Sequence, residues 1–386
     1  MIDIKDKKKC CGCTACASVC AHKAITMLPD SLGFLYPVVD ESVCTNCGIC
    51  ERVCPFNERY DTTDNLPTPI AFAARHKEMG EIMKSRSGAS FAALSDYVLE
   101  QGGMVYGAGY KDHFVVAHKR AGTRVQRDEF RGSKYVQSDL RGIFVQVKED
   151  LKAGSWVLFS GTPCQTAGLR SFLGKKLSSK LILVDIICHG VPSPYIWRDY
   201  IDFLEKEHRS KVVGVDFRNK MKYGWRAHRD TIYFANGEED DTSWYSTEFH
   251  KHLHYRPSCG VCYFCNLKRP SDFTLGDFWG LEIQNKDFNS DNKGANLLLI
   301  NTEKGKTLFK HIKASLNLLP TSPEIYTQLN PQLRTPLWVH PKSGKFAEDY
   351  VNKGFLYIYH HDYDKVSLPH LWLRLLKKNI CKLLHR

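Results

Sequence analysis

The chain has 386 residues, of which 43% are hydrophobic and 25% charged, so it has the composition of a soluble globular protein with two or three domains. This composition excludes a disordered chain, a collagen-like chain and a small disulfide-stapled module. The 54 Lys and Arg residues exceed the 42 Asp and Glu residues, which gives a formal net charge of +12. Nucleic acid, an anionic membrane surface, an acidic partner and a phosphorylated cofactor are all compatible with this charge.

Cysteine is the unusual component of the chain, with 15 residues. Nine lie between Cys10 and Cys54, and the others are Cys164, Cys188, Cys259, Cys262, Cys265 and Cys381. The N-terminus shows no apolar core of a signal peptide, and no run of about 18 apolar residues occurs. We therefore expect a cytoplasmic protein. In a reducing compartment, clustered thiols indicate metal ligands or catalytic groups rather than disulfides.

The domain organisation follows from shifts in composition. Residues 1–56 are predicted to form a cysteine-rich module, and residues 57–69 are polar and turn-forming, as in a linker. Residues 70–355 show alternating helix and strand signals, which predict a mixed α/β domain. Residues 356–386 predict a basic amphipathic C-terminal helix. Such a helix can lie at the inner face of an anionic membrane, or it can pack against its own domain.

The α/β domain is predicted to begin with a helix and to continue with strands and helices in alternation. In chain order, the predicted elements are a helix near 89–101, strands at 102–110 and 114–118, a helix near 143–152, a strand at 156–160, a helix near 165–173, a strand at 181–187, a helix near 195–207, short strands at 212–217 and 231–234, a strand at 295–301 and a helix at 302–314. The apolar strands at 156–160 and 181–187 are separated by a helix. They therefore predict a parallel βαβ unit.

A run of four cysteines occurs twice in the N-terminal module. The run Cys10-x2-Cys13-x2-Cys16-x3-Cys20 recurs 34 residues later as Cys44-x2-Cys47-x2-Cys50-x3-Cys54, and proline follows the second copy. This is the spacing of bacterial two-cluster ferredoxins, in which the fourth cysteine of each run ligates the other cluster. We therefore predict two 4Fe-4S clusters, one held by Cys10, Cys13, Cys16 and Cys54 and the other by Cys20, Cys44, Cys47 and Cys50. Cys11 is left over. The alternative is a pair of zinc sites, which typically use two spaced pairs of ligands.

A second set of cysteines follows the two predicted parallel strands. Cys164 comes after the strand at 156–160, and Cys188 comes after the strand at 181–187. Ligands of open α/β sheets bind at such carboxyl ends. The loop Cys259-x2-Cys262-x2-Cys265 can cap the same crevice. We predict a third cluster held by Cys164, Cys188, Cys259 and Cys262. Cys265 is the alternative ligand, in place of Cys259 or Cys262. The alternative is that Cys164 and Cys188 are small buried hydrophobic residues.

Seven further motifs carry a resemblance to a known family. They are SRSGA at 85–89, GGMVYGA at 102–108, RGSKYVQS at 131–138, FSGTPCQTAGL at 159–169, DIICHGVPSP at 185–194, RPSCGVC at 256–262 and RPSDFTLGDFWG at 269–280. Together they resemble the beta-subunit family of coenzyme F420 hydrogenases and dehydrogenases. More narrowly, the chain resembles the bacterial branch in which a two-cluster ferredoxin domain precedes the flavoprotein domain. The resemblance implies an FAD beside a 4Fe-4S cluster, and electron transfer to a two-electron acceptor.

The FAD that the resemblance implies would not be held by a dinucleotide-fold motif, because no GxGxxG follows the first strand of the α/β domain. Ser87 and Gly88 precede one predicted helix, and Thr162 and Gln165 lie at the start of another, where free backbone amides favour a pyrophosphate. Lys134 can neutralise a phosphate or lie near flavin N1. The alternative for Lys134 is a solvated surface lysine.

His189 is the predicted proton donor of the reaction. Two-electron reduction of a carbon substrate usually needs a proton donor near neutral pH, and His189 follows Cys188 at a strand end. The alternative is a histidine whose ring is satisfied by protein groups. The other candidates are His228, His250, His252 and His254.

Three functions follow from these predictions. The leading one is an iron-sulfur flavoprotein oxidoreductase that passes electrons from ferredoxin or another redox donor through three 4Fe-4S clusters to FAD, and on to an organic two-electron acceptor, a sugar or polysaccharide precursor being one candidate. The second is an electron-relay subunit of a larger hydrogenase or dehydrogenase complex acting on coenzyme F420. The third is a zinc-stabilised protein that binds polyanions. The chain shows no nucleic-acid-binding motif, so we expect no nucleic-acid partner.

Overall fold

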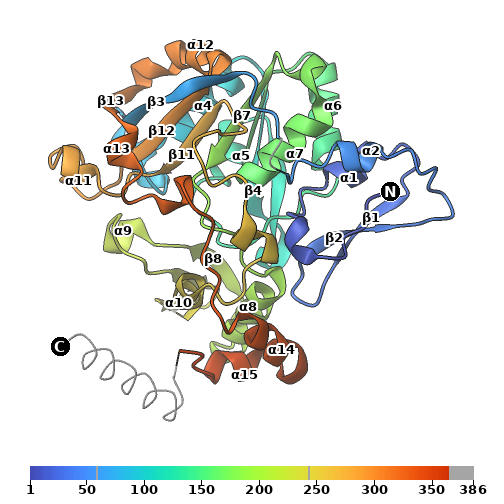
Figure 1. Cartoon of the computed structure of the whole chain (residues 1–386). Coiled ribbons are helices and arrows are strands. Elements are labelled where there is room, and N and C mark those ends of the chain that lie inside the picture. The colour runs from blue at the N-terminus through green and yellow to red at the C-terminus, as the bar shows by residue number, and fades with distance from the viewer. Residues whose placement is uncertain (58–59, 242–243, 365–386) are drawn as a thin grey trace, which may run out of the picture.

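The computed structural model describes residues 1–57, 60–241 and 244–364. A small N-terminal module, blue in Figure 1, lies beside a larger α/β body. The body is built on a large mixed sheet, which confirms the predicted fold class. Of the predicted C-terminal helix at 356–386, the residues after Asp364 lie outside the described part of the chain. No helix within the described ranges is long and apolar enough to cross a membrane.

The N-terminal module consists of one hairpin and two short helices. These are β1 (Ile25–Pro29), β2 (Leu35–Val39), α1 (Ala15–Val19) and α2 (Ile49–Arg52). The strands pair antiparallel. Thr14 precedes α1 with φ 68° and Gly48 precedes α2 with φ 72°, so both helices start from a left-handed residue. Cys16 lies in α1 and Cys50 in α2. The sequence repeat is therefore also a structural repeat.

The body is organised around a sheet of eight strands (Figure 1). In spatial order they are β13 (Leu316–Thr321), β3 (Asn65–His76), β12 (Asn296–Thr302), β11 (Phe273–Asp277), β7 (Leu181–Ile186), β6 (Val157–Gly161), β4 (Met104–Tyr110) and β5 (Val116–Ala121). The neighbours β11, β7, β6 and β4 are parallel, and the flanking pairs are antiparallel. The parallel pairing of β6 with β7 confirms the predicted βαβ unit.

Strand β3 differs from the prediction, because it begins inside the stretch 57–69 that the sequence predicts as a linker. Asn65 pairs with Thr302 of β12, and the strand then continues between β12 and β13. The polar start of β3 is thus held by backbone pairing rather than by apolar side chains.

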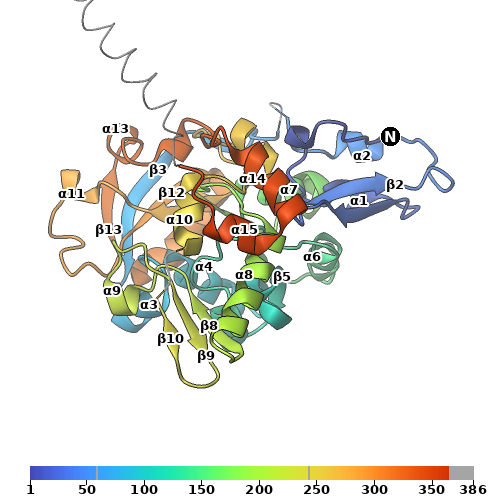
Figure 2. The same cartoon turned by 90° about the horizontal axis from the view of Figure 1, so that it is seen from below.

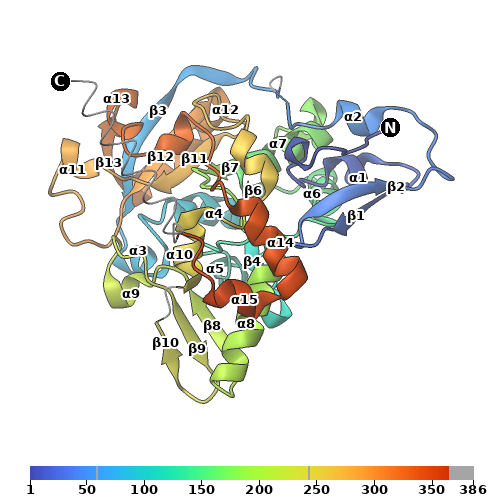
Figure 3. The ribbon, with the colours of Figure 1, turned by 60° about the horizontal axis from the view of Figure 1, so that its bottom comes forward.

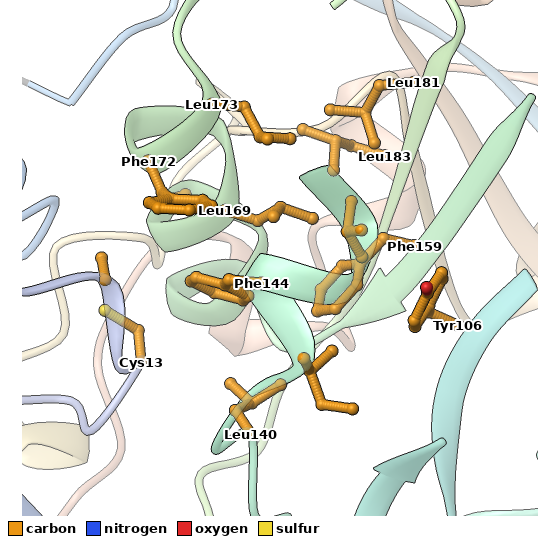
Figure 4. Packing of buried hydrophobic residues seen from close by; sticks show 14 of the residues in the cluster. Cys13, Tyr106, Leu140, Phe144, Phe159, Leu169, Phe172, Leu173, Leu181 and Leu183 are labelled. Atoms are coloured by element: carbon orange, nitrogen blue, oxygen red, sulfur yellow. The ribbon is translucent and has the colours of Figure 1, made fainter. Parts of the chain in front are cut away.

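Helices cover both faces of the sheet. On one face lie α6 (Ile143–Lys152) and α7 (Pro163–Leu173), and on the other lie α4 (Ser90–Glu100) and α12 (Glu303–Ile312). In β6, Val157 and Phe159 pack toward α6 and α7, whereas Leu158 packs toward the opposite face. This alternation is that of a strand buried on both sides. Cys13 of the N-terminal module packs in the same core as α6 and α7 (Figure 4).

The remaining elements lie partly below the large sheet and partly against it (Figure 1). They are the antiparallel strands β8 (Val212–Asp216), β9 (Thr231–Phe234) and β10 (Glu239–Asp240), and the helices α3 (Met79–Lys84), α5 (Arg124–Asp128), α8 (Pro194–Glu207), α9 (Lys220–Tyr223), α10 (Trp244–Lys251), α11 (Leu281–Gln284), α13 (Pro323–Tyr326), α14 (Ser343–Lys353) and α15 (Phe355–His360). The small sheet projects from the body (Figure 2). Helix α15 packs beside α8 (Figure 3).

Candidate metal centre

The first set of thiols, here called the inner set, consists of Cys10, Cys13, Cys16 and Cys54. All four line one cavity, together with apolar side chains such as Ile2 and Met27. The set combines three cysteines of the first run with the last cysteine of the second run, as the ferredoxin pattern predicts. Burial, and after it the neighbouring thiol of Cys10, raises the pKa of Cys16 to about 12. The structure thus brings the four predicted ligands of one cluster to one place.

The outer set, Cys20, Cys44, Cys47 and Cys50, lies closer to solvent. Cys47 is exposed, and the other three are partly exposed. Backbone amides are directed at two of the sulfurs, since the Ile2 N–H lies 3.4 Å from Cys50 Sγ and the Ala24 N–H lies 3.3 Å from Cys20 Sγ. Hydrogen bonds of this kind tune thiolates that ligate iron.

A second cavity, here called the sheet cavity, lies at the carboxyl ends of β6 and β7. Its lining includes six cysteines: Cys11, Cys164, Cys188, Cys259, Cys262 and Cys265. Cys164 lies in the first turn of α7 and Cys188 follows β7, while the others come from the loop around residues 259–265 and from the N-terminal module. The crevice predicted from strand order is therefore present, and the predicted cysteine loop caps it.

A buried ion pair supports the cysteine loop of the sheet cavity. Arg269 and Asp185 are 1% and 0% exposed, and their charged groups lie 2.8 Å apart. The Arg269 guanidinium also donates to the carbonyl oxygens of Phe264 at 2.7 Å and Ile186 at 3.0 Å. Because Phe264 lies between Cys262 and Cys265, this pair ties the loop to the end of β7.

The donor chemistry of the sheet cavity fits an iron-sulfur cluster. Burial, and after it the neighbouring thiol of Cys164, raises the pKa of Cys188, and burial followed by the thiol of Cys188 raises the pKa of Cys259. Crowded thiols can all be ionised only when a cation lies among them. A hydrogen bond from Cys265 lowers the pKa of Cys262 to about 7. Of the described residues that line the cavity, none is Asp, Glu or His, which leaves a soft, all-sulfur donor set.

The geometry differs from that of a mononuclear site. Within residues 1–57, 60–241 and 244–364, no group of three or more His, Cys, Asp or Glu side chains is arranged to hold a single metal ion. A cubane spreads its four thiolate ligands over four iron atoms, so a cavity lined by thiols is the corresponding arrangement.

Cys11 is a residue that both cavities share. It is 4% exposed and lines the inner cavity and the sheet cavity, as Phe56 also does. A hydrogen bond with the thiol of Cys13, and after it burial, raises the pKa of Cys11, although a hydrogen bond with the thiol of Cys164 acts in the opposite direction. The contact is possible because α7 carries Gly168, where a Cβ atom would lie 2.8 Å from the Cβ of Cys13. No spacing rule could have assigned this position, since it depends on how the module packs on α7.

Ser87 and Gly88, two of the predicted flavin contacts, are packed in the seam between β3 and β12. The Ser87 hydroxyl donates to the carbonyl oxygen of Ala295 at 2.8 Å. A Cβ atom at Gly88 would lie 2.1 Å from the carbonyl oxygen of Ala74. The N–H of the first residue of α4 donates to Asn296 Oδ1 at 3.0 Å. Protein groups therefore occupy the positions that were predicted for a pyrophosphate.

Thr162 and Gln165 form a capping box at the start of α7. Gln165 Oε1 accepts from the Thr162 N–H at 2.9 Å, and Gln165 Nε2 donates to Ser138 Oγ at 3.0 Å. Thr162 also lines the sheet cavity, with its hydroxyl 3.1 Å from Cys164 Sγ. Gln165 thus orients the helix that carries Cys164.

Lys134 lies apart from the other predicted flavin contacts. Its ammonium group donates to the carbonyl oxygens of Glu129 at 2.8 Å and Arg131 at 2.7 Å. Burial lowers the pKa of Lys134 to about 7. Of the five predicted contacts, Thr162 alone lines either thiol cavity.

His189 lies in a chain of hydrogen bonds. Gln332 Nε2 lies 2.7 Å from His189 Nδ1, His189 Nε2 lies 2.8 Å from His252 Nε2, and His252 Nδ1 lies 2.8 Å from the carbonyl oxygen of Trp338. The Trp338 carbonyl oxygen can only accept, so His252 Nδ1 donates to it. In a neutral ring His252 Nε2 then accepts, and His189 Nε2 donates to it. Burial, and after it His252, lowers the pKa of His189 to about 4. Both ring nitrogens of His189 are thus satisfied by protein groups.

Comparisons with known proteins match two segments of the chain to known families. Residues 9–57 match the family model of the 4Fe-4S dicluster domain, and residues 154–324 match that of the C terminus of the coenzyme F420 hydrogenase/dehydrogenase beta subunit. No curated protein matches the chain. Among solved structures, the chain is similar to a chain of the xenon-derivatised F420-reducing NiFe hydrogenase complex from Methanosarcina barkeri, with 19% identity, coverage of 74% of this chain and 90% of that chain, and a TM-score of 0.48. Residues 154–324 therefore belong to the beta-subunit family of coenzyme F420 hydrogenases and dehydrogenases, an oxidoreductase-type family, and residues 9–57 preceding them belong to the 4Fe-4S dicluster domains.

Proposed function

We propose that the chain is an iron-sulfur flavoprotein oxidoreductase. In this proposal, electrons pass from a redox donor such as ferredoxin through three 4Fe-4S clusters to FAD, and then to an organic two-electron acceptor. The observation that supports it is the wall shared by the two thiol-lined cavities, which Cys11 and Phe56 form. A storage or purely structural role for the cysteines would not require such proximity.

The order of transfer follows from exposure. Cys47 of the outer set is exposed, so an external donor can contact the module there. Cys13 and Cys16 of the inner set are buried, and the inner set adjoins the sheet cavity through Cys11. Bound clusters supply one-electron transfer, and the protein supplies ligands, orientation and exclusion of water. The order is therefore outer set, inner set and sheet cavity.

The residues around the sheet cavity hold the ligands in place. Thr162 and Gln165 fix the first turn of α7, which carries Cys164. The Gly190 N–H is directed at Cys188 Sγ at 3.3 Å. Apolar side chains, among them Phe56 and Phe264, line the same cavity and limit the access of water.

FAD enters the proposal through the resemblance that the seven sequence motifs carry. Ser87, Gly88, Lys134 and Gln165 are bonded to or packed against neighbouring protein groups, so the predicted contacts do not form a single flavin site. Flavin content after anaerobic purification is the direct test. Oxidised protein with about one flavin per chain supports the proposal, and protein with clusters but without flavin removes FAD from it.

A second candidate is an electron-relay subunit of a larger complex that acts on coenzyme F420, and the name of the matched family favours it. A relay subunit has no substrate site of its own. To separate the two, the purified protein is reduced anaerobically with ferredoxin or dithionite and then mixed with oxidised coenzyme F420, NAD(P)+ or nucleotide sugars. Rapid reoxidation by any one of these acceptors supports the oxidoreductase and identifies its acceptor, whereas no reoxidation by any of them supports the relay subunit.

Metal analysis tests the common basis of both candidates. Three cubanes predict about 12 iron and about 12 acid-labile sulfide per chain. A colourless protein that contains zinc, without iron or sulfide, would overturn both redox functions and favour the zinc-stabilised polyanion-binding protein.

A further inference from the structure

Arg256 extends from the wall of the sheet cavity to the inner set. Its N–H donates to the carbonyl oxygen of Val191 at 3.0 Å, and its carbonyl oxygen accepts from the Cys259 N–H at 3.0 Å. Its side chain points the other way, because Nε donates to the carbonyl oxygen of Cys10 at 2.8 Å and Nη2 lies 3.6 Å from Cys10 Sγ. One residue thus contacts ligands of two predicted clusters.

The guanidinium of Arg256 is a buried cation without a carboxylate partner in the described part of the chain. It is 1% exposed, and its other contacts are the Leu35 carbonyl oxygen at 2.9 Å, Gln137 Oε1 at 2.8 Å and the Tyr36 ring at 4.4 Å. Other buried arginines do have carboxylate partners: Arg127 with Asp96, Arg218 with Asp277 and Arg269 with Asp185. Burial of a charge is unfavourable unless an opposite charge lies close by. A negative group close to Arg256 would therefore stabilise its buried charge.

The turn between Cys10 and Cys13 packs closely around the Arg256 guanidinium. Gly12 has φ +71°, and a Cβ atom there would lie 2.7 Å from Arg256 Nη1. Gln137 accepts from Arg256 and donates through Nε2 to the carbonyl oxygen of Cys11 at 3.0 Å. The charge is consequently held at a defined position next to Cys10 and cannot move into solvent.

We propose that Arg256 is the counter-charge of the inner cluster and raises its reduction potential above that of the outer cluster. This inference rests on the proposed function. Four thiolates make a cluster anionic, and reduction adds a further electron, so a buried cation in contact with Cys10 favours the reduced form. Arg52, a cation in the segment that carries the outer-set thiols, is exposed, so solvent screens its charge.

The step concerned is the transfer of one electron from the outer set to the inner set. The outer cluster is oxidised by one electron and the inner cluster is reduced by one, and no bond forms or breaks. With Arg256 in place the transfer is downhill toward the sheet cavity.

The test is a potentiometric titration of the full-length holoprotein, followed by EPR. A Cys47→Ser variant, which lacks the outer cluster, assigns the two signals. In Arg256→Gln, we expect the equilibrium between the two clusters to shift at least tenfold toward the reduced outer cluster. A tenfold shift is about 59 mV for a one-electron couple. Arg256→Lys keeps the charge and should shift the equilibrium less.

Two further variants make the result specific. Gln137→Glu places a carboxylate beside Arg256 and should lower the inner potential in the same direction, although the arginine is retained. Arg52→Gln removes an exposed cation and should leave the inner potential unchanged. If Arg256→Gln loses the iron of the inner cluster, Gln137→Glu supplies the measurement.

An unchanged inner potential in Arg256→Gln or Gln137→Glu, with full iron content, would overturn the role of Arg256 and reduce it to a clamp on the Cys10 and Leu35 carbonyl groups. Absence of cluster signals from the wild-type protein would instead overturn the proposed function. The two failures are therefore distinguishable.

Discussion

The outer set and the sheet cavity hold the same kind of side chain in opposite surroundings. Cys47 is exposed, and its pKa is lowered chiefly by the N–H of Ile49 at the start of α2. Cys188 follows a central strand of the sheet, and burial raises its pKa. Three of the four thiols of the outer set come from residues 44–50, whereas the thiols of the sheet cavity come from distant segments of the chain. Loss of a ligand should therefore remain local in the outer set, whereas at the sheet cavity it should also interrupt electron transfer between the module and the body.

The largest effect is expected from breaking the Arg269–Asp185 ion pair, which supports the cysteine loop of the sheet cavity. Arg269→Met leaves Asp185, which is 0% exposed, without its counter-ion. Removing one partner of a buried pair costs about 3–5 kcal/mol of unfolding free energy. The loop with Cys262 and Cys265 loses its anchor at the same time. Denaturant unfolding and iron analysis should show lower stability and the loss of about four iron atoms. A variant with wild-type stability and iron content would contradict the supporting role of the pair.

Removal of one thiol from the sheet cavity should have the next largest effect. Cys164→Ala and Cys188→Ala should each lose about four iron atoms and uncouple the dicluster domain from flavin reduction, while the fold is retained. Stopped-flow measurement of flavin reduction by reduced ferredoxin checks the coupling. Cys11→Ala is the matched control in the same cavity and should keep full iron content. Full electron transfer in Cys164→Ala would refute its ligand role.

Loss of a ligand from the outer set should stay local. Cys47→Ser should remove about four iron atoms and leave the flavin and the sheet cluster in place. Because the side chain is exposed, we expect the unfolding free energy of the body to change by less than about 0.5 kcal/mol. Iron analysis and denaturant unfolding of the same sample give both numbers. Unchanged iron would show that the ferredoxin assignment is wrong.

The last prediction concerns stability alone, at a buried histidine outside the three thiol sets. His254 is 1% exposed, neither ring nitrogen bonds a protein group in the described chain, and burial lowers its pKa to about 3. The unfolded chain, with a histidine pKa of about 6.5, binds the proton more readily, so stability is lost as pH falls below about 6.5. His254→Leu should raise the unfolding free energy by about 1–3 kcal/mol, with a larger gain at acidic pH. Unfolding at two pH values measures it, and an equal gain at both would contradict the assignment.

Local patterns in the sequence were sufficient for the parallel half of the sheet. Helix α6 has the predicted bounds, and β6 and β7 pair as predicted. In the antiparallel half, the strand predicted at 295–301 corresponds to β12, but β3 was not predicted. Pro67 and Pro69 at the start of β3 are typical of a linker, and the pairing partners of this strand lie more than 200 residues away. Local apolar patterns cannot identify partners at such a distance.

The candidate site was predicted to a similar extent. Cysteine spacing and strand order identified the thiols of both cavities, since both signals are local. The contacts of Cys11 and Arg256 arise only when segments separated by more than 100 residues pack together. A buried arginine without a carboxylate has no signature in the sequence, because its burial and its neighbours are properties of the folded chain.

Gly168 has a consequence for how fast electrons can move within the chain. A Cβ atom there would lie 2.9 Å from Cys13 Sγ, so the dicluster module is seated on α7 without an intervening layer. Transfer from the module to the body then needs no diffusive encounter, and its rate should be independent of solvent viscosity and salt concentration. The approach of an external donor to Cys47 is a collision between molecules and should respond to both. Glycerol or salt would therefore slow the delivery of electrons to the chain but not their passage through it.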